Sequence, residues 1–107
     1  MAKIQIDKND IEILAKKNSP LLLKMAKSYD PLFFSNLYEL QPKLWPSELT
    51  FCIYLKLNFT TGEIAKFLNV SQSAIENRRN RLRKKLNIPS DADLFEWLNN
   101  IQTHELK

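Results

Sequence analysis

Apolar side chains recur three and four positions apart along most of this chain, the spacing that one face of an amphipathic helix requires. Short polar or proline-containing segments interrupt the pattern and mark helix ends. The sequence therefore predicts an all-α fold with seven helices, over residues of about 8–17, 21–28, 31–40, 46–57, 61–69, 72–86 and 91–102. One glycine and five prolines in 107 residues favour the same class, because sheet-rich folds need more turn residues.

Most of the predicted helices begin at a residue that can cap them. A capping box is expected at Thr60 and Glu63, where the hydroxyl accepts from the Glu63 amide and the carboxylate reaches back. Further N-caps are expected at Asp7 or Asn9, at Asp30, at Ser71, and at Ser90 or Asp91. Asn58 is expected to end its helix in the left-handed conformation, since asparagine tolerates a positive φ.

The segment Gln41-Pro42-Lys43 is the best candidate boundary within the chain. It divides a N-terminal helical extension, residues 1–42, from a C-terminal domain, residues 43–107. The helix before the boundary carries a rich apolar face, made of Phe33, Phe34, Leu37 and Tyr38. We expect this face to pack on the domain that follows; the alternative is a surface for a second protomer.

Positive charge is concentrated in one helix. Residues 71–88 hold all four arginines, two lysines and one acid, Glu76, for a local charge of +5. The rest of the chain has 10 lysines and 11 acids and sums to −1. Such local basicity predicts a phosphate-binding surface, although a basic helix face can also be an ordinary solvated one.

The same helix has two distinct stripes. On a helical wheel Ile75, Leu82 and Leu86 fall together and predict the buried side. The opposite side carries Ser73, Asn77, Asn80 and Lys84, with Glu76 and Arg81 at its edges. Exposed amides can pair with adenine in a major groove while the cations meet phosphates, and a short connection at residues 69–71 completes a helix-turn-helix candidate.

From Leu44 onward the chain resembles the LuxR-type helix-turn-helix domain, and it is similar to the C-terminal domain of Bacteroidetes transcription regulators. The residues that carry the resemblance are Leu44 and Glu48 at the family's opening motif, with Trp45 in the place of its threonine, Glu63-Ile64-Ala65 with Leu68 and Val70-Ser71 in the scaffold helix, and Lys85-Leu86 with Ile88 at the end of the recognition helix. Ala74-Ile75 replaces the Thr-Val of the family's recognition helix. The implied fold is a LuxR-like tetrahelical helix-turn-helix domain preceded by short N-terminal helices.

The resemblance implies a sequence-specific transcription regulator that binds duplex DNA, as a homodimer and with RNA polymerase as a further partner. It places Glu76, Asn77 and Asn80 at the bases, and Ser73 shares their stripe. The positions it implies near phosphates are Thr61, Gln72, Arg79, Arg81 and Lys84. The last helix corresponds to the one through which such domains often dimerise, with Leu94, Trp97, Leu98 and Ile101 as the expected interface.

Three residues depart from the family's pattern. Trp45 replaces the usual threonine cap, so its helix starts differently or uses the indole as a packing anchor. Gly62 stands where a lysine is usual, which removes a phosphate contact. Glu76 replaces a lysine that commonly contacts bases; it either accepts from cytosine N4 or ties down Arg79 or Asn80, and we favour the latter.

The remaining residues favour neither an enzyme nor a cofactor site. Cys52 is the only cysteine, which excludes an internal disulfide and a cysteine-rich metal centre, and its apolar neighbours predict burial. There is no glycine-rich phosphate loop, no nucleophile–histidine arrangement and no visible small-molecule site. Glu48 and Glu63 are better explained as an orienting salt bridge and a helix cap than as a catalytic pair.

The chain lacks an uninterrupted apolar stretch of 18 residues, so we expect no membrane association and a cytoplasmic location. Two rival functions stay open. One is a protein–protein interaction module on the same scaffold, with reduced DNA binding and residues 32–40 as the working surface. The other is a region similar to a sigma factor that contacts a promoter element.

Overall fold

The computed structural model describes residues 6–105, with side chains described for residues 6–101. Within this part the chain is all-helical and contains no strand, as the apolar spacing predicted. The helices are α1 (Lys8–Lys16), α2 (Leu22–Tyr29), α3 (Pro31–Leu40), α4 (Pro46–Lys56), α5 (Thr61–Leu68), α6 (Gln72–Leu86) and α7 (Leu94–Glu105). None of these helices has the length and apolar character needed to cross a membrane.

Local caps start most of the helices where the sequence indicated. Asp7 caps α1, the Asp30 carboxylate accepts from the Phe33 amide at 3.4 Å, and the Ser71 hydroxyl accepts from the Ala74 amide at 3.1 Å. The capping box of α5 is complete: the Glu63 amide donates to the Thr60 hydroxyl at 3.1 Å, and the Thr60 amide donates to the Glu63 carboxylate at 2.8 Å. Each cap satisfies an amide that the first helical turn leaves without a partner.

The prediction for the start of the last helix was wrong. Ser90 and Asp91 lie in a turn closed by the Ala92 amide donating to the Pro89 carbonyl at 3.1 Å. The cap is Asp93, whose carboxylate accepts from the Glu96 amide at 3.0 Å. Proline at position 89 sets the turn, and the turn moves the start of α7 to Leu94.

Asparagine, rather than glycine, closes the ends of α1, α4, α5 and α6. Asn18, Asn58, Asn69 and Asn87 have φ of 50°, 66°, 58° and 56°. In each case the next amide reaches back five residues: Ser19 to Leu14, Phe59 to Tyr54, Val70 to Ala65 and Ile88 to Arg83, at 2.8 to 3.3 Å. These are Schellman closures, and asparagine tolerates the left-handed position better than other residues with a side chain. The prediction for Asn58 is confirmed.

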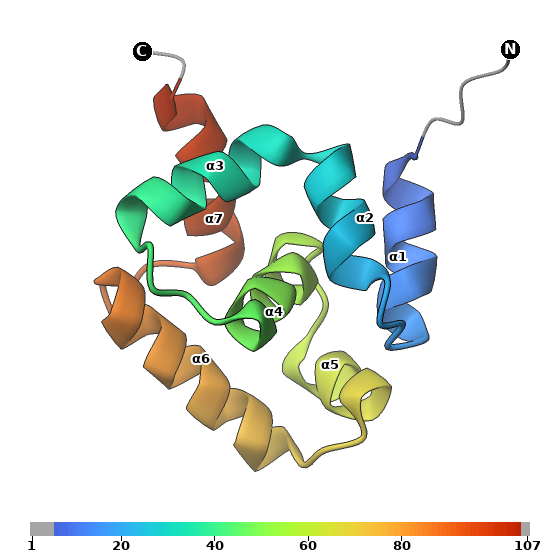
Figure 1. The fold of residues 1–107 in the computed structure, drawn as a ribbon. Helices are drawn as coiled ribbons and strands as arrows, with labels where there is room; N and C mark the ends of the chain where they lie inside the picture. The colour runs from blue at the N-terminus through green and yellow to red at the C-terminus, as the bar shows by residue number, and fades with distance from the viewer. Residues whose placement is uncertain (1–5, 106–107) are drawn as a thin grey trace, which may run out of the picture.

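The core is centred on α4, which packs against α2 and α7 (Figure 1). Six of its residues are buried: Leu49, Phe51, Cys52, Ile53, Tyr54 and Leu55. The Tyr54 hydroxyl donates to the Ala15 carbonyl at 2.5 Å and so ties the end of α1 to the central helix. Burial on most sides explains why α4 lacks a clear polar stripe in the sequence.

The N-terminal helices contribute to the same core as the C-terminal ones. Phe33, Phe34 and Leu37 are buried, and α3 packs against α7, so the expected packing of this face is confirmed for these three residues. Tyr38 is 36% exposed instead, with Lys27 Nζ 5.6 Å from its ring centroid. At the predicted boundary, the Gln41 side chain donates to the Lys85 carbonyl at 3.1 Å and joins the end of α3 to α6.

Trp45 does not pack into the core. Its side chain is 67% exposed, so of the two alternatives for Trp45 the packing anchor is wrong and a different start of the helix remains. The start of α4 is held instead by the Glu48 carboxylate, which accepts from the Trp45 amide at 2.8 Å. Pro46 at the first helical position then fixes the backbone, so the indole is not needed there.

Candidate nucleic-acid interface

The candidate interface is α6, the longest helix of the described chain, which runs along one edge of the molecule (Figure 1). Ser71 caps its start and Asn87 closes its end. Ile75, Leu82 and Leu86 are 0%, 2% and 8% exposed and hold it against the body of the protein. The predicted buried stripe is therefore confirmed, and it fixes which side of α6 faces solvent.

The opposite stripe is fully available to a partner. Ser73, Asn77, Asn80 and Lys84 are all exposed, as the helical wheel predicted. Their spacing aligns a hydroxyl, two amides and one ammonium along about three turns of the helix. Such a row offers hydrogen-bond donors and acceptors to a flat, polar surface.

Glu76 lies exposed at the edge of this stripe without the local contact that we favoured. Within residues 6–101 the ion pairs are Lys56 with Asp30 and Lys85 with Glu48, and Glu76 takes part in neither. Its carboxylate also accepts no hydrogen bond from Arg79 or Asn80 in this part of the chain. The expectation that Glu76 ties down one of these side chains is therefore wrong, and its carboxylate faces solvent.

The six cations of α6 divide into two kinds. Arg83 Nη1 donates to the Pro89 carbonyl at 3.0 Å and to the Ala92 carbonyl at 2.8 Å. Lys85 Nζ pairs with the Glu48 carboxylate at 2.7 Å, so the predicted orienting salt bridge of Glu48 is confirmed. Both cations hold α6 against neighbouring segments, and no pattern in the sequence distinguished them from the other four cations.

The other four cations have no hydrogen-bond or ion-pair partner among the described residues. Arg78, Arg81 and Lys84 are exposed and Arg79 is half-buried. On the wheel Arg78 and Arg81 lie on one flank of the outer stripe, and Arg79 lies on the other. The positive surface of α6 therefore consists of these four side chains, arranged on both sides of the polar stripe.

The start of α5 lies beside the start of α6. Thr61 and Gly62 are half-buried in the first turn of α5, and Gln72 is exposed in the first turn of α6. A Cβ added at Gly62 would lie 3.5 Å from Gln72 Nε2, which is ordinary contact. The first turn of α5, which holds Thr61, therefore lies near Gln72, and Gln72 and Arg79 share one flank of α6.

The expected dimer residues of α7 are mostly core residues. Leu94, Leu98 and Ile101 are 2%, 0% and 6% exposed, on the helix that packs against α3 and α4. A side chain already buried in its own chain has no surface left for a second copy. Among the four predicted residues Trp97 alone is partly exposed, and Phe95, which was not predicted, is 36% exposed beside it.

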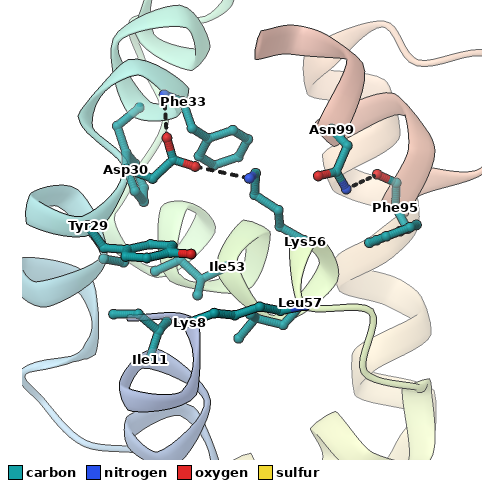
Figure 2. A pocket seen from close by; sticks show the side chains of 12 residues that line it. Lys8, Ile11, Tyr29, Asp30, Phe33, Ile53, Lys56, Leu57, Phe95 and Asn99 are labelled. Carbon is teal, nitrogen blue, oxygen red and sulfur yellow. Dashed lines mark hydrogen bonds and ion pairs between the residues drawn. The ribbon is translucent and has the colours of Figure 1, made fainter. Parts of the chain in front are cut away.

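A separate hollow of about 200 Å³ lies where α1, α2, α3, α4 and α7 meet (Figure 2). Lys56 Nζ pairs with Asp30 at 3.0 Å and lies 4.9 Å from the Phe33 ring centroid; Asn99 donates to the Phe95 carbonyl at 2.8 Å. These polar groups bond to one another or to the chain. The Asp30–Lys56 pair, with about a fifth of each side chain exposed, joins the start of α3 to the end of α4.

Two further observations concern chemistry. Burial, reinforced by the nearby Glu48 carboxylate, raises the pKa of the Cys52 thiol to about 12. The thiol is therefore protonated and shielded at neutral pH, as its apolar position predicted. Among the described residues no three of the histidines, cysteines and acids converge in a way that could hold a metal ion.

Comparisons with known proteins gave no match: no family model, no curated protein and no solved structure is similar enough to this chain to identify it. What the surface of α6 binds is therefore inferred from its own residues.

Proposed function

We propose that this protein is a sequence-specific regulator that binds duplex DNA, with α4 to α7 as a LuxR-like tetrahelical helix-turn-helix domain. In this proposal α5 is the scaffold helix and α6 enters the major groove. The observation that carries the proposal is the outer face of α6, where exposed amides are flanked on both sides by cations that bond to nothing else in the described chain.

The dimensions and chemistry of a major groove suit this face. The groove is about 12 Å wide and admits one helix with its side chains. Asn77 and Asn80 then meet base edges, where an amide pairs bidentately with adenine. Arg78 and Arg81 face the backbone of one strand, and Thr61, Gln72 and Arg79 face that of the other. Lys84 follows the stripe toward the end of the helix.

The first test is the salt dependence of affinity for duplex DNA. If each protomer neutralises about four to six phosphates, log K should fall with log salt at a slope of about −4 to −5. A labelled random duplex followed by fluorescence anisotropy at several salt concentrations measures this slope. A slope near zero sinks the proposal, because four free cations cannot meet a polyanion without releasing its counterions.

The second test separates base contacts from backbone contacts. Asn77→Ala and Asn80→Ala should each reduce discrimination between preferred and random duplexes by about 1–3 kcal/mol. Arg81→Ala should weaken binding to all sequences alike and reduce the salt slope by about 1. Asn100→Ala is a matched control, because Asn100 is an exposed asparagine on α7. If Asn77→Ala keeps the natural sequence preference, the face of α6 that we propose for base contacts is the wrong one.

A third test adds a contact. Gly62 occupies the place where the resembling family carries a lysine, and the 3.5 Å clearance to Gln72 leaves room for a Cβ. Gly62→Lys should make the salt slope steeper by about 1 and raise affinity at low salt, because a new cation reaches the backbone. Gly62→Ala controls for the gain in helix propensity, about 1 kcal/mol. Equal affinities for the two variants would place this turn away from the DNA.

The proposal includes two copies on a two-fold site, with half-sites about 34–36 Å apart. The surface that remains for a partner on α7 includes Phe95 and the exposed part of Trp97. Phe95→Glu should therefore give a monomer by light scattering without loss of helicity. An unaltered mass would move the interface to another face.

A second candidate is a protein–protein interaction module with reduced DNA binding. It is favoured by the exposed carboxylate of Glu76 and by exposed apolar residues on α3: Leu32 at 41% and Leu40 at 55%. This candidate predicts no salt-dependent duplex binding by the natural chain. It also predicts that Glu76→Lys, which restores a cation beside the amides, creates such binding.

A further inference from the structure

Trp45 is the most exposed of the large apolar side chains in the described part of the protein, at 67%. It stands at the start of α4, directly before Pro46, and the hydrogen bond from its own amide to Glu48 holds the backbone there. The backbone of Trp45 is therefore held in place, while its indole ring is exposed to solvent. Aromatic rings presented in this way are common in surfaces that bind other molecules.

The ring borders a hollow of about 380 Å³ between the start of α4 and one flank of α6. We call this hollow the Trp45 groove; besides Trp45 its lining includes Ser47, Phe51, Arg78, Arg81 and Leu82. Phe51 and Leu82 are 4% and 2% exposed and form an apolar floor. Arg78 and Arg81 are exposed and form a cationic side.

The groove is positively charged in spite of one acid in its lining. The Glu48 carboxylate already accepts from the Trp45 amide at 2.8 Å and from Lys85 Nζ at 2.7 Å, so its charge is compensated within the protein. Arg78 and Arg81 have no such partner among the described residues. Two uncompensated guanidinium groups beside an exposed indole suit an occupant that alternates anionic and apolar parts.

We propose that the Trp45 groove holds the sugar–phosphate backbone of one DNA strand, the strand that borders the major groove entered by α6. Arg78 and Arg81 pair with successive phosphates, and the Trp45 ring packs against the deoxyribose between them. This inference rests on the proposed function, because the groove lies on the flank of the helix that carries Asn77 and Asn80. It adds the first turn of α4 to the DNA-contacting surface.

Tryptophan fluorescence tests the proposal directly. Trp45→Phe leaves Trp97 as the remaining tryptophan, so the difference between the natural chain and this variant isolates the Trp45 signal. A saturating duplex should shift the Trp45 emission to shorter wavelength and lower its acrylamide quenching constant several-fold. The Trp97 signal of the Trp45→Phe variant should stay unchanged.

Affinities give a second, independent readout. Trp45→Ala should weaken duplex binding by roughly five- to tenfold without altering the salt slope, since the lost contact is apolar. Arg78→Ala should instead reduce the salt slope by about 1. Circular dichroism should show both variants folded, because both side chains are exposed.

The outcomes are distinguishable. If anisotropy shows duplex binding while Trp45 quenching and the Arg78→Ala slope stay unchanged, the groove proposal is overturned and the proposed function stands. If no duplex binds, both fail. Polyglutamate is the control for an acidic peptide: equal protection of Trp45 by polyglutamate and by duplex at equal charge concentration overturns the assignment to DNA.

Discussion

Arg83 and Arg81 lie two positions apart on the same helix, yet their replacement by alanine should have opposite consequences. Arg83 Nη1 donates to the Pro89 and Ala92 carbonyls at 3.0 and 2.8 Å, across the turn that leads into α7. Arg81 is exposed and has no hydrogen-bond or ion-pair partner among the described residues. Arg83→Ala should therefore destabilise the protein, whereas Arg81→Ala should weaken the duplex binding that we propose.

The magnitude follows from the two hydrogen bonds. A hydrogen bond to a charged group contributes about 1.5–3 kcal/mol when it is sheltered, and less near water. Arg83 is half-buried, and one of its two bonds is exposed. We expect a loss of about 2 kcal/mol, which corresponds to roughly 10 °C in Tm for a domain of this size. Arg81→Ala should stay within about 0.5 kcal/mol of the natural chain.

Two measurements on both variants test the difference. Urea unfolding followed by circular dichroism should show the Arg83→Ala midpoint lower by about 1–2 M at an unchanged m-value. Duplex titration should show the natural salt slope for Arg83→Ala and a slope reduced by about 1 for Arg81→Ala. Arg83→Lys is a further control, because it keeps the charge and loses the planar guanidinium, and it should recover about half of the stability.

The assignment of Arg83 to stability and of Arg81 to duplex binding is refuted by either of two results. Arg83→Ala is as stable as the natural chain, or it lowers the salt slope as much as Arg81→Ala does. The first result would mean that water replaces the two carbonyl contacts at no cost. The second would place Arg83 at the DNA backbone and leave the position of α7 to its apolar contacts alone.

Three further predictions concern the fold. Leu98→Ala should cost about 2–5 kcal/mol of unfolding free energy, because Leu98 is 0% exposed; a variant that lost a dimer but no stability would instead place this residue in an interface. Asn87→Ala should lower the unfolding free energy by about 1–2 kcal/mol in the same urea experiment, because the φ of residue 87 is 56°, in the left-handed region. Asn87→Gly should be as stable as the natural chain, because glycine adopts this φ freely. Equal losses for the two variants would mean that the asparagine side chain, and not the backbone conformation, contributes the stability. Cys52 should react with a thiol reagent at pH 8 only as fast as the protein opens, because the thiol is buried; rapid labelling of the folded protein would contradict this burial. The unfolding free energy should fall as the pH rises from 9.0 toward about 12, since the thiol of the unfolded chain ionises first.

The residues that start and end most helices were predictable because their partners are close in sequence. The Thr60–Glu63 capping box, the Ser71 cap and the left-handed Asn58 each depend on atoms within five residues, so a short stretch of sequence contains the whole interaction. The start of α7 was predicted wrongly because the local sequence offers more than one capping residue. Ser90, Asp91 and Asp93 can all cap a helix, and only the folded turn after Pro89 selects Asp93.

The candidate site was predictable as a pattern and not as a set of contacts. Helical periodicity separated the buried Ile75 from the exposed Asn77, because the position on a helix follows from spacing. It could not separate Arg83 from Arg81, since the carbonyls that bind Arg83 lie in a turn whose position depends on α7. The exposure of Trp45 was missed for a related reason: a large apolar side chain is usually buried, and the groove beside it forms only when α4 and α6 pack.

By itself, then, the sequence determined the helical class, the bounds of most helices and the outer face of α6, because local hydrogen bonds and the helical repeat decide these features. The tertiary structure decided what each face meets. The apolar stripe of α7 indicated burial but not whether its own chain or a second copy covers it, and packing against α3 and α4 assigns Leu94, Leu98 and Ile101 to the core. The basic run of α6 indicated positive charge but not its use. Contacts with Pro89, Ala92 and Glu48 engage Arg83 and Lys85 within the protein, so these two cations do not belong to the exposed positive surface of α6.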